Sequence, residues 1–316
     1  MSGTVLTAGI DLGGTNVRIA LVDADGRIVG DVSRPRPLGA GELVASMAGS
    51  IEELERLHGP ADAVGIGAAG LVGPGGFVHY AANIAELVET PLRDLANGAI
   101  GKPVLVDNDA NVAALAEMTY GAVRGVSDAL VVTIGTGVGG GVICNGALVR
   151  GAHGFAAEIG HWQVVEDGPR CACGEYGHWE AIASGTALGR MGRERAAWDA
   201  APGLLDRAGG AIDAITGELV GAAAQDGDGD ALAILHDFAD HVALGFAGLA
   251  NIFDPAVIAV SGGLARLGPV FLDPVRAAFG HRLEGAEFRP EVPIVPATLG
   301  AEAGVVGAAI LARAAR

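Results

Sequence analysis

The 316-residue chain is poor in positive charge and contains a single lysine, Lys102. It has 20 lysines and arginines against 37 aspartates and glutamates, which gives a net charge of −17. This balance excludes a nucleic-acid partner, because recognition of a phosphate backbone needs a basic surface. The lysine does not belong to a P-loop, since the preceding residues lack that motif's first glycine and Pro103 replaces its Ser or Thr. Any phosphate group that the protein binds must therefore be held by backbone N–H groups, arginine and metal.

The sequence also has few cysteines and no recognisable export signal. Only three cysteines are present, and the N-terminus carries no basic region and reaches Asp11 too early for a signal peptide. We therefore expect a cytoplasmic protein without disulfides. The uncharged run 129–149 is long enough to span a bilayer, but its glycines and β-branched residues favour two buried strands, so no membrane partner is expected.

Two glycine-rich turns between β-branched strands are the most informative features. They lie within Ala8 to Asp23 (AGIDLGGTNVRIALVD) and Ala129 to Val149 (ALVVTIGTGVGGGVICNGALV). Glycines let backbone N–H groups approach an anion closely, so two such turns predict a clamp for nucleotide phosphates. Asp11 adds a carboxylate suited to the Mg²⁺ that accompanies ATP. Each turn alone fits an ordinary glycine hairpin equally well.

Strands and helices alternate along the chain. Hydrophobic runs predict strands at residues 63–69, 103–106 and 256–265, and helical spacing predicts helices at 41–58 and 304–315. This alternation predicts an α/β protein.

The segment VDNDANVAALAE, residues 106–117, follows a predicted strand and opens a helix. It leaves Asn108 and Asp109 at the carboxyl end of the strand, where α/β proteins commonly bind ligands. A carboxylate there can accept a proton from a substrate hydroxyl, which is the role of the base in phosphoryl transfer. The alternative is a helix N-cap, which aspartate also favours.

A cluster of potential metal ligands follows. His161, Cys171, Cys173 and His178 lie in a glycine-broken stretch, and their spacing predicts a tetrahedral structural zinc site. Without metal, the histidines would be surface residues and the cysteines buried apolar ones. Cys144 lies in an apolar, strand-like run and is expected in the core.

Together these motifs resemble the ROK group of bacterial sugar kinases, and within it the ATP-dependent glucokinases. The DLGGT turn, the VDNDAN segment, the GTGVGGG turn and the EIGH…CACG…GHWE block occur in that order over the whole chain. GTGVGG also matches a dinucleotide-binding pattern, but a strand follows it where that pattern requires a helix.

The resemblance implies an actin-like (ribonuclease H-like) fold of two α/β domains, with ATP and sugar bound in the cleft between them. The smaller domain would comprise residues 1–112 and a terminal helix at 300–316, and the larger one residues 113–299 with the zinc loop. The residues that match the nucleotide site are Asp11, Gly13, Gly14 and Thr15 in the first loop, Gly135, Thr136 and Gly137 in the second, and Gly262 and Gly263 at the adenosine.

The resemblance also assigns the acceptor site. Asp109 matches the general base that takes the proton of the sugar's 6-hydroxyl. The residues that match positions binding sugar hydroxyls are Asn83, Asn108, Glu158, His161 and Glu180. His161 would then serve both zinc and sugar, so that the metal holds the sugar site in shape.

Two departures from the family pattern bear on specificity. His178 stands where the family usually has a third zinc-binding cysteine. Around Asn83, Ala82 and Leu87 stand where glucokinases often carry proline and tryptophan, so the wall of the sugar site is altered.

These features predict a cytoplasmic, ATP- and Mg²⁺-dependent hexose kinase that acts on glucose, contains structural Zn²⁺ and forms a homo-oligomer, a dimer or tetramer. The alternatives within enzymes are a kinase for N-acetylglucosamine or N-acetylmannosamine, and a fructokinase. The alternative outside enzymes is a sugar-sensing ROK regulator. We do not expect it, since the first strand begins near Leu6, before which a DNA-binding domain has no room.

Overall fold

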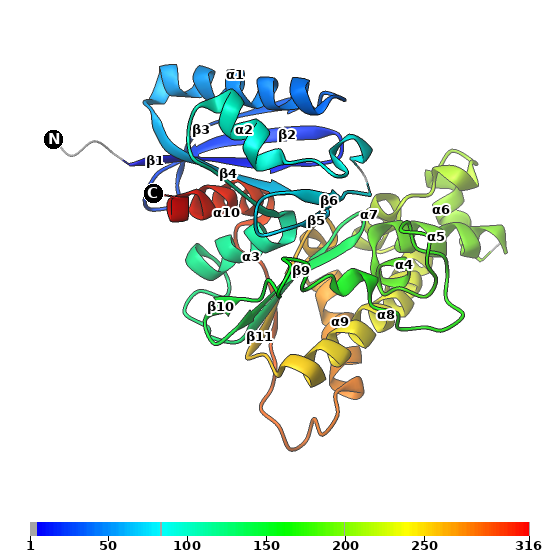
Figure 1. Cartoon of the computed structure of the whole chain (residues 1–316). Coiled ribbons are helices and arrows are strands. Elements are labelled where there is room, and N and C mark those ends of the chain that lie inside the picture. The colour runs from blue at the N-terminus through cyan, green and yellow to red at the C-terminus, as the bar shows by residue number, and fades with distance from the viewer. Residues whose placement is uncertain (1–4, 83, 199, 316) are drawn as a thin grey trace. The chain divides into compact units, whose positions relative to one another are not determined.

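The computed structural model describes residues 5–82, 84–198 and 200–315, which form two compact units, both of helices and strands (Figure 1). The first comprises Met1–Gly125, Ala147–Ala157 and Thr298–Arg316, and the second Val126–Gly146 and Glu158–Ala297. The α/β class is thus confirmed. The predicted domain division, with boundaries after residue 112 and before residue 300, stays a prediction; it differs from these units in dividing α3 (Asp109–Tyr120), which lies whole in the first.

The first unit is built on a sheet of order β3-β2-β1-β4-β7. These strands run Ile28–Pro35, Asn16–Val22, Leu6–Leu12, Ala61–Ala68 and Val104–Asn108. β2 is antiparallel to both β1 and β3, whereas β1, β4 and β7 are parallel. The register aligns Asp11 with Gly67 and Gly67 with Asp107, so the carboxyl ends of the three parallel strands lie at one edge of the sheet.

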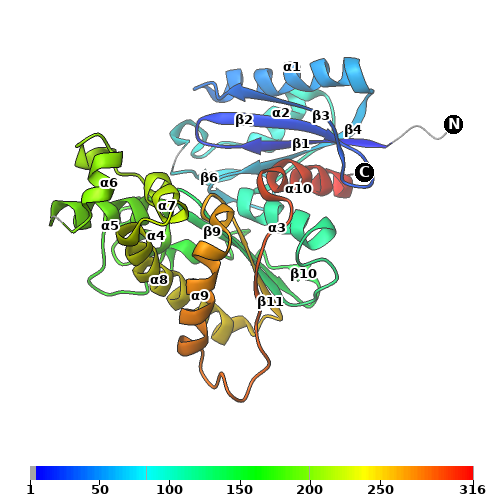
Figure 2. The same cartoon turned by 180° about the vertical axis from the view of Figure 1, so that it is seen from behind.

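Helices cover both faces of this sheet. α1 (Ala40–His58) and α2 (Leu92–Ile100) lie on one face, and α3 and α10 (Ala303–Ala312) on the other, as both views show (Figures 1 and 2). α10 approaches the strands so closely that a Cβ added at Gly9 would lie 1.8 Å from the Val305 carbonyl oxygen. The short elements of the unit are β5 (Leu71–Val72), β6 (Val78–Tyr80), η1 (Ala85–Leu87), β10 (Ala147–Leu148), η5 (Gly300–Glu302) and η6 (Arg313–Ala315).

A buried carboxylate joins two distant parts of the first unit. Glu117, near the end of α3, is 0% exposed. Its Oε2 accepts hydrogen bonds from the backbone N–H groups of Ala122 (2.7 Å) and Thr298 (3.1 Å), and its Oε1 accepts one from Leu299 (2.7 Å). The segment after α3 and the segment before α10 are therefore held by the same side chain.

The second unit contains β9 (Val138–Cys144), β8 (Ala129–Ile134), β11 (Val257–Ser261) and β12 (Ile294–Pro296) side by side in this order. β8 and β9 are antiparallel, and β11 is parallel to β8 and β12. The run 129–149 thus contains the two predicted strands, β8 and β9, separated by a turn and followed by the short strand β10. The helices are α4 (Glu180–Ala183), α5 (Gly185–Ala197), α6 (Pro202–Arg207), α7 (Gly217–Gln225), α8 (Gly229–Phe253) and α9 (Pro269–Arg282), with η2 (Ile159–His161), η3 (Ile212–Ala214) and η4 (Leu264–Leu267).

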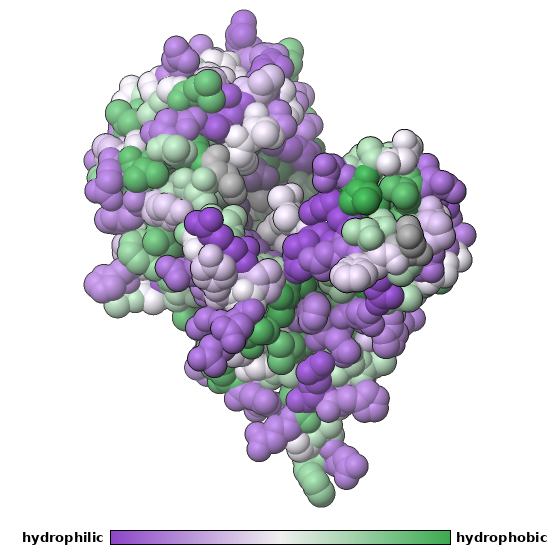
Figure 3. Space-filling view, turned by 90° about the vertical axis from the view of Figure 1, so that its right-hand side faces the viewer, coloured by the Kyte–Doolittle hydropathy of each residue, from purple (hydrophilic) through white to green (hydrophobic). Residues whose placement is uncertain are grey.

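By length and composition α8 is apolar enough to cross a membrane. However, 56% of its most apolar window is buried inside the protein, which is typical of a core helix. Phe238 and Phe246 of α8 are both fully buried. On the face drawn in Figure 3, hydrophilic residues are interspersed with hydrophobic patches, in keeping with the high net charge.

Candidate functional site

The first predicted phosphate loop is the turn between β1 and β2. Gly13, Gly14 and Thr15 form this turn, which the Gly13 N–H closes by donating to the Asn16 carbonyl oxygen at 3.0 Å. Gly14 and Thr15 have carbonyl oxygens that accept hydrogen bonds from Arg36, both at 2.8 Å, one from its Nε and one from its backbone N–H. The turn is therefore a β-hairpin turn, which was one of the two interpretations of the sequence. Arg36, which lies outside the turn, holds it through these two hydrogen bonds.

Asp11 lies on β1 just before this turn. Its pKa is raised from 3.8 to about 6, mainly by burial and then by the negative charge of Asp109, while Arg18 opposes the change. α10 begins against this side chain, since a Cβ added at Gly304 would lie 2.6 Å from Oδ2 of Asp11. Two partly buried carboxylates, those of Asp11 and Asp109, therefore face the same edge of the first sheet.

The end of β7 and the start of α3 carry the predicted base. The side chain of Asn108, rather than that of Asp109, caps α3: its Oδ1 accepts from the N–H groups of Ala110 (2.8 Å) and Asn111 (3.1 Å), while its Nδ2 donates to the Gly70 carbonyl oxygen. Asp109 is the first residue of the helix, and burial raises the pKa of its carboxyl group. The N-cap alternative thus belongs to Asn108, while Oδ1 of Asp109 accepts a hydrogen bond of 2.9 Å from the N–H of the next residue, Ala110. The role of Asp109 as a base stays a prediction.

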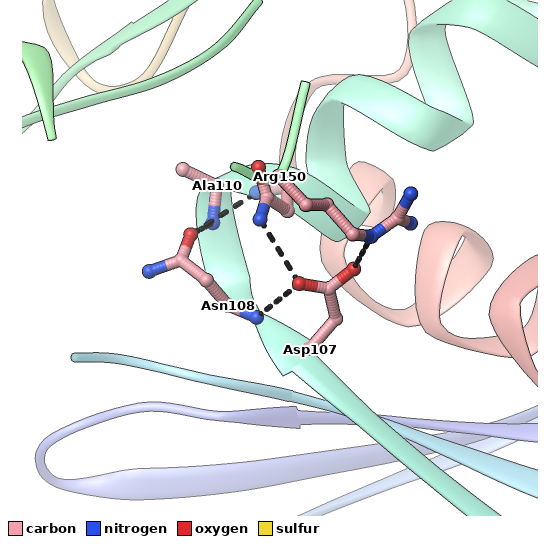
Figure 4. Close-up of polar contacts among 5 residues, drawn as sticks. Asp107, Asn108, Ala110 and Arg150 are labelled. Carbon is pink, nitrogen blue, oxygen red and sulfur yellow. Dashed lines mark hydrogen bonds and ion pairs between the residues drawn. The ribbon is translucent and has the colours of Figure 1, made fainter. Parts of the chain in front are cut away.

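Asp107 anchors this strand end through three polar contacts (Figure 4). Its Oδ1 accepts from the Asn108 N–H (2.8 Å) and from Nδ2 of Asn111 (2.9 Å), and its Oδ2 from Nε of Arg150 (2.7 Å). Sequence reasoning missed Asp107, Asn111 and Arg150. Asp107 and Asn111 lie within the motif that carries Asp109, but no pattern indicates that Arg150, 43 residues later, reaches Asp107.

The predicted nucleotide residues of the second unit also lie together. Gly135, Thr136 and Gly137 form the turn between β8 and β9, closed by a hydrogen bond of 2.9 Å from the Gly135 N–H to the Gly137 carbonyl oxygen. Gly262 follows β11 with φ +92°, and a Cβ there would lie 2.4 Å from the Ile134 carbonyl oxygen, so only glycine fits. Gly263 follows it, and both glycine turns stand at the carboxyl ends of neighbouring parallel strands.

The four predicted metal ligands converge in the second unit. The ligand atoms of His161, Cys171, Cys173 and His178 lie within 4.8 Å of one another. Nδ1 of His161 lies 3.4 Å from Nδ1 of His178 and 3.7 Å from Sγ of Cys171, and Sγ of Cys173 lies 3.3 Å from Nδ1 of His178. A tetrahedral zinc ion with bonds of ~2.0–2.3 Å requires ligand separations of ~3.3–3.8 Å. The cluster therefore has the size of a zinc site.

Glu180 connects this cluster to the glycine turn of the same unit. Its Oε2 accepts a hydrogen bond of 2.9 Å from the Val138 N–H, and its Oε1 lies 3.5 Å from Sγ of Cys171. A Cβ added at Gly137 would lie 2.2 Å from that Oε2, so the carboxylate occupies the space that glycine leaves. Glu158 directly precedes η2, and its carbonyl oxygen accepts from the His161 N–H at 3.0 Å.

The predicted acceptor loop is the stretch that follows Asn83 and contains η1 (Ala85–Leu87). Leu87 is 0% exposed and packs in the hydrophobic core of the first unit, and its expected effect on the wall of the sugar site stays a prediction. Glu86 is the partly exposed residue of this short helix, and its carboxylate pairs with Arg36. Asn83, predicted to bind sugar, lies outside the described residues.

The family model described as "ROK family" matches residues 7–315. The chain belongs to the ROK family. It is 40% identical over 311 residues to a glucokinase of Streptomyces coelicolor, with 98% of each chain covered.

Two solved ROK structures resemble this protein closely. One is a glucokinase from Streptomyces griseus in complex with glucose and AMPPNP, with a TM-score of 0.88, 41% identity and coverage of 98% of this chain and 99% of that one. The other is a hexokinase from Thermus thermophilus, with a TM-score of 0.82, 33% identity and coverage of 98% of both. This likeness confirms the predicted actin-like sugar kinase fold of this ROK protein.

Proposed function

We propose that this protein is an ATP-dependent hexose kinase that phosphorylates the 6-hydroxyl of glucose. The observation that carries the proposal is the partly buried carboxylate of Asp109, which follows the end of β7 at the edge of the sheet where β1 leads into the first glycine turn. The similarity to glucokinases over nearly the whole chain supports the same activity.

In the proposed reaction Asp109 accepts the proton of the sugar's 6-hydroxyl as that oxygen bonds to the γ-phosphorus of ATP. The bond between the γ-phosphorus and the bridging oxygen breaks, and ADP leaves with its electron pair. The products are glucose 6-phosphate, ADP and the proton taken by Asp109. The raised pKa of Asp109 makes the carboxylate a stronger base than a free aspartate.

The nucleotide's phosphates would bind to backbone N–H groups of the two glycine turns. The residues assigned to this role are Asp11, Gly13, Gly14, Thr15, Gly135, Thr136, Gly137, Gly262 and Gly263. Asp11 would hold Mg²⁺, since this ion is usually bound through one or two carboxylates and the substrate's phosphates. Bound Mg²⁺ neutralises charge on the transferring phosphoryl group.

The residues proposed to bind the acceptor hydroxyls are Asn83, Asn108, Glu158, His161 and Glu180. Asn108 has both lone pairs of Oδ1 committed to the cap of α3, so only its Nδ2 group is left to donate to a sugar oxygen. Such a site discriminates against analogues that lack a hydroxyl, because its own buried groups then stay unpaired.

The test of this function is kcat/KM for glucose, mannose, fructose, N-acetylglucosamine and N-acetylmannosamine at saturating MgATP. We expect glucose to be preferred, 2-deoxyglucose to be clearly poorer and the N-acetylated sugars poorer still. An N-acetylated sugar preferred by about tenfold, which is about 1.4 kcal/mol in transition-state binding, would reject the glucose assignment and favour the hexosamine kinase. Absence of phosphorylation of every sugar would favour a sugar-sensing regulator.

The cluster of His161, Cys171, Cys173 and His178 supports structural zinc, because its ligand separations fit a tetrahedral ion. We expect about one zinc per chain in protein purified without chelator. His178→Cys, which restores a thiolate ligand, is expected to keep the metal, and His178→Ala to lose it. Zinc that stays bound in His178→Ala would show that His178 is not a ligand.

We also propose that the protein is cytoplasmic and that it forms a homo-oligomer, a dimer or tetramer. Size-exclusion chromatography with light scattering tests the oligomeric state.

A further inference from the structure

Arg36 lies between two functional loops of the first unit. Its side chain is only 8% exposed, less than that of any other cation that forms an ion pair within residues 5–82, 84–198 and 200–315. It donates from Nε to the Gly14 carbonyl oxygen and from Nη1 to the Pro37 carbonyl oxygen (3.3 Å), and Nη1 also pairs with Oε1 of Glu86. One guanidinium thus contacts both the first glycine turn and the η1 helix.

The contacts with the turn fix the direction of its peptide groups. Arg36 binds two consecutive carbonyl oxygens, that of Gly14 through Nε and that of Thr15 through its own backbone N–H. In a planar trans peptide the N–H points opposite to the C=O. The Thr15 N–H shares its peptide plane with the Gly14 carbonyl group and is therefore directed away from Arg36. A turn that binds phosphate needs its N–H groups set in this way before the anion arrives.

Glu86 links the turn to the segment that follows Asn83, because its carboxylate pairs with the guanidinium of Arg36 that also binds the turn. The segment itself is anchored, because Ile84 and Leu87 are fully buried in the core. The partner of Arg36 therefore comes from a fixed short helix, and Arg36 lowers the pKa of the Glu86 carboxyl group by hydrogen bonding to its ionised form.

A purely stabilising role accounts poorly for this pair. Removing an arginine from water is costly, and an ion pair with a partly exposed partner such as Glu86, whose side chain is 24% exposed, gains little net stability. By contrast, the rigid fork of a guanidinium is well suited to holding several acceptors in one geometry.

We propose that Arg36 is a positioning residue for the phosphate turn, and that Glu86 couples the turn to the acceptor loop, so that a change in one alters binding at the other. This inference rests on the proposed function, since it takes the turn to bind nucleotide and the segment around Asn83 to bind sugar. Coupling of this kind is reciprocal.

The test measures binding of MgAMPPNP by calorimetry without any sugar, and then KM for MgATP and for glucose. Glu86→Gln, on the acceptor loop, is expected to weaken nucleotide binding by about fivefold or more, as in coupled sites. Arg36→Ala is expected to weaken it by about tenfold or more, the loss of a charged hydrogen bond. Arg36→Lys is expected to recover part of this loss, because an ammonium keeps the charge but not the fork.

Two matched controls separate this role from general effects of charge. Glu89→Gln alters an exposed glutamate three residues away, and Arg34→Ala alters an exposed arginine two residues away that pairs with Glu53. Both are expected to bind MgAMPPNP like the wild type. Should Arg36→Ala fail to fold, Arg36→Lys and Glu86→Gln still carry the test.

Two results would overturn the proposal. One is nucleotide affinity of Glu86→Gln within twofold of the wild type. The other is a double-mutant cycle of Glu86→Gln and Arg36→Lys without coupling. Failure of the wild type to bind MgAMPPNP would instead overturn the proposed function itself, so the two failures are distinguishable.

Discussion

Replacement of Glu117 by glutamine tests how the first unit is held together. The carboxylate is fully buried and accepts three backbone hydrogen bonds, from Ala122, Thr298 and Leu299. Glutamine has nearly the same shape but offers one oxygen and one NH₂ group. In its better orientation the oxygen keeps the bonds from Ala122 and Thr298, and the NH₂ group faces the Leu299 N–H, donor against donor.

The expected cost follows from these three bonds. A buried N–H left without an acceptor costs about 1–3 kcal/mol, and each retained bond weakens by about 1 kcal/mol when the acceptor loses its charge. The smaller desolvation cost of a neutral amide offsets part of this loss. We therefore expect Glu117→Gln to lower the free energy of unfolding by about 3 kcal/mol. For a chain of 316 residues, with an unfolding entropy of about 2.1 cal/mol/K per residue, this is a fall of roughly 5 °C in Tm.

The assay is thermal unfolding followed by circular dichroism, with hydrogen exchange of the peptide that contains Thr298 and Leu299. Hydrogen exchange of this peptide is expected to accelerate in the variant, because the N–H groups of Thr298 and Leu299 lose their charged acceptor. The matched control is Glu287→Gln, which alters an exposed glutamate and is expected to shift the free energy by less than about 0.5 kcal/mol. A Glu117→Gln protein that melts within about 1 °C of the control would refute the hydrogen-bond accounting.

Three further substitutions address the site. Asp109→Asn is expected to lower kcat by at least about 10²-fold while MgAMPPNP still binds. In the wild type, kcat is expected to fall as the pH is lowered, because the protonated carboxyl group of Asp109 cannot accept a proton. This fall is expected at a pH above the ordinary pKa of 3.8, because burial raises the Asp109 pKa. Unchanged turnover in the variant would reject this base. Gly137→Ala places a Cβ 2.2 Å from Oε2 of Glu180 and is expected to raise KM for glucose. Gly229→Ala, whose added Cβ would meet open space, is expected to leave this KM unchanged. Equal KM values in the two variants would contradict the placement of Glu180. Arg150→Gln removes the Nε contact with Asp107, so the strand end that precedes Asp109 is less well oriented, and kcat is expected to fall by up to about tenfold. The control is Arg124→Gln, which alters an exposed arginine. Identical kcat values in the two variants would show that the contact with Asp107 does not matter.

Local patterns in the sequence were sufficient for several features. The α/β class followed from alternating hydrophobic runs, and the helix predicted at residues 41–58 is α1, Ala40–His58. The clustering of His161, Cys171, Cys173 and His178 was also predictable, because these residues lie within one loop-rich stretch and short spacing alone restricts how far apart they can be. These features depend on neighbours in the chain, whose geometry is set by backbone periodicity and turn chemistry.

Other features were decided only by tertiary structure. The sequence left Asp109 as either base or N-cap, and the hydrogen bonds show Asn108 as the cap. The burial of Leu87 in the core was likewise decided by tertiary packing.

The contacts that hold the site join residues far apart in the chain: Arg36 with Glu86, Asp107 with Arg150, and Glu117 with Leu299. Single polar residues at such separations leave no periodic signal in the sequence. Of these residues, Asp107 lies at the end of β7, where the parallel strands align at one edge of the sheet. For all three pairs, only the packed fold determines which side chains lie within hydrogen-bonding distance.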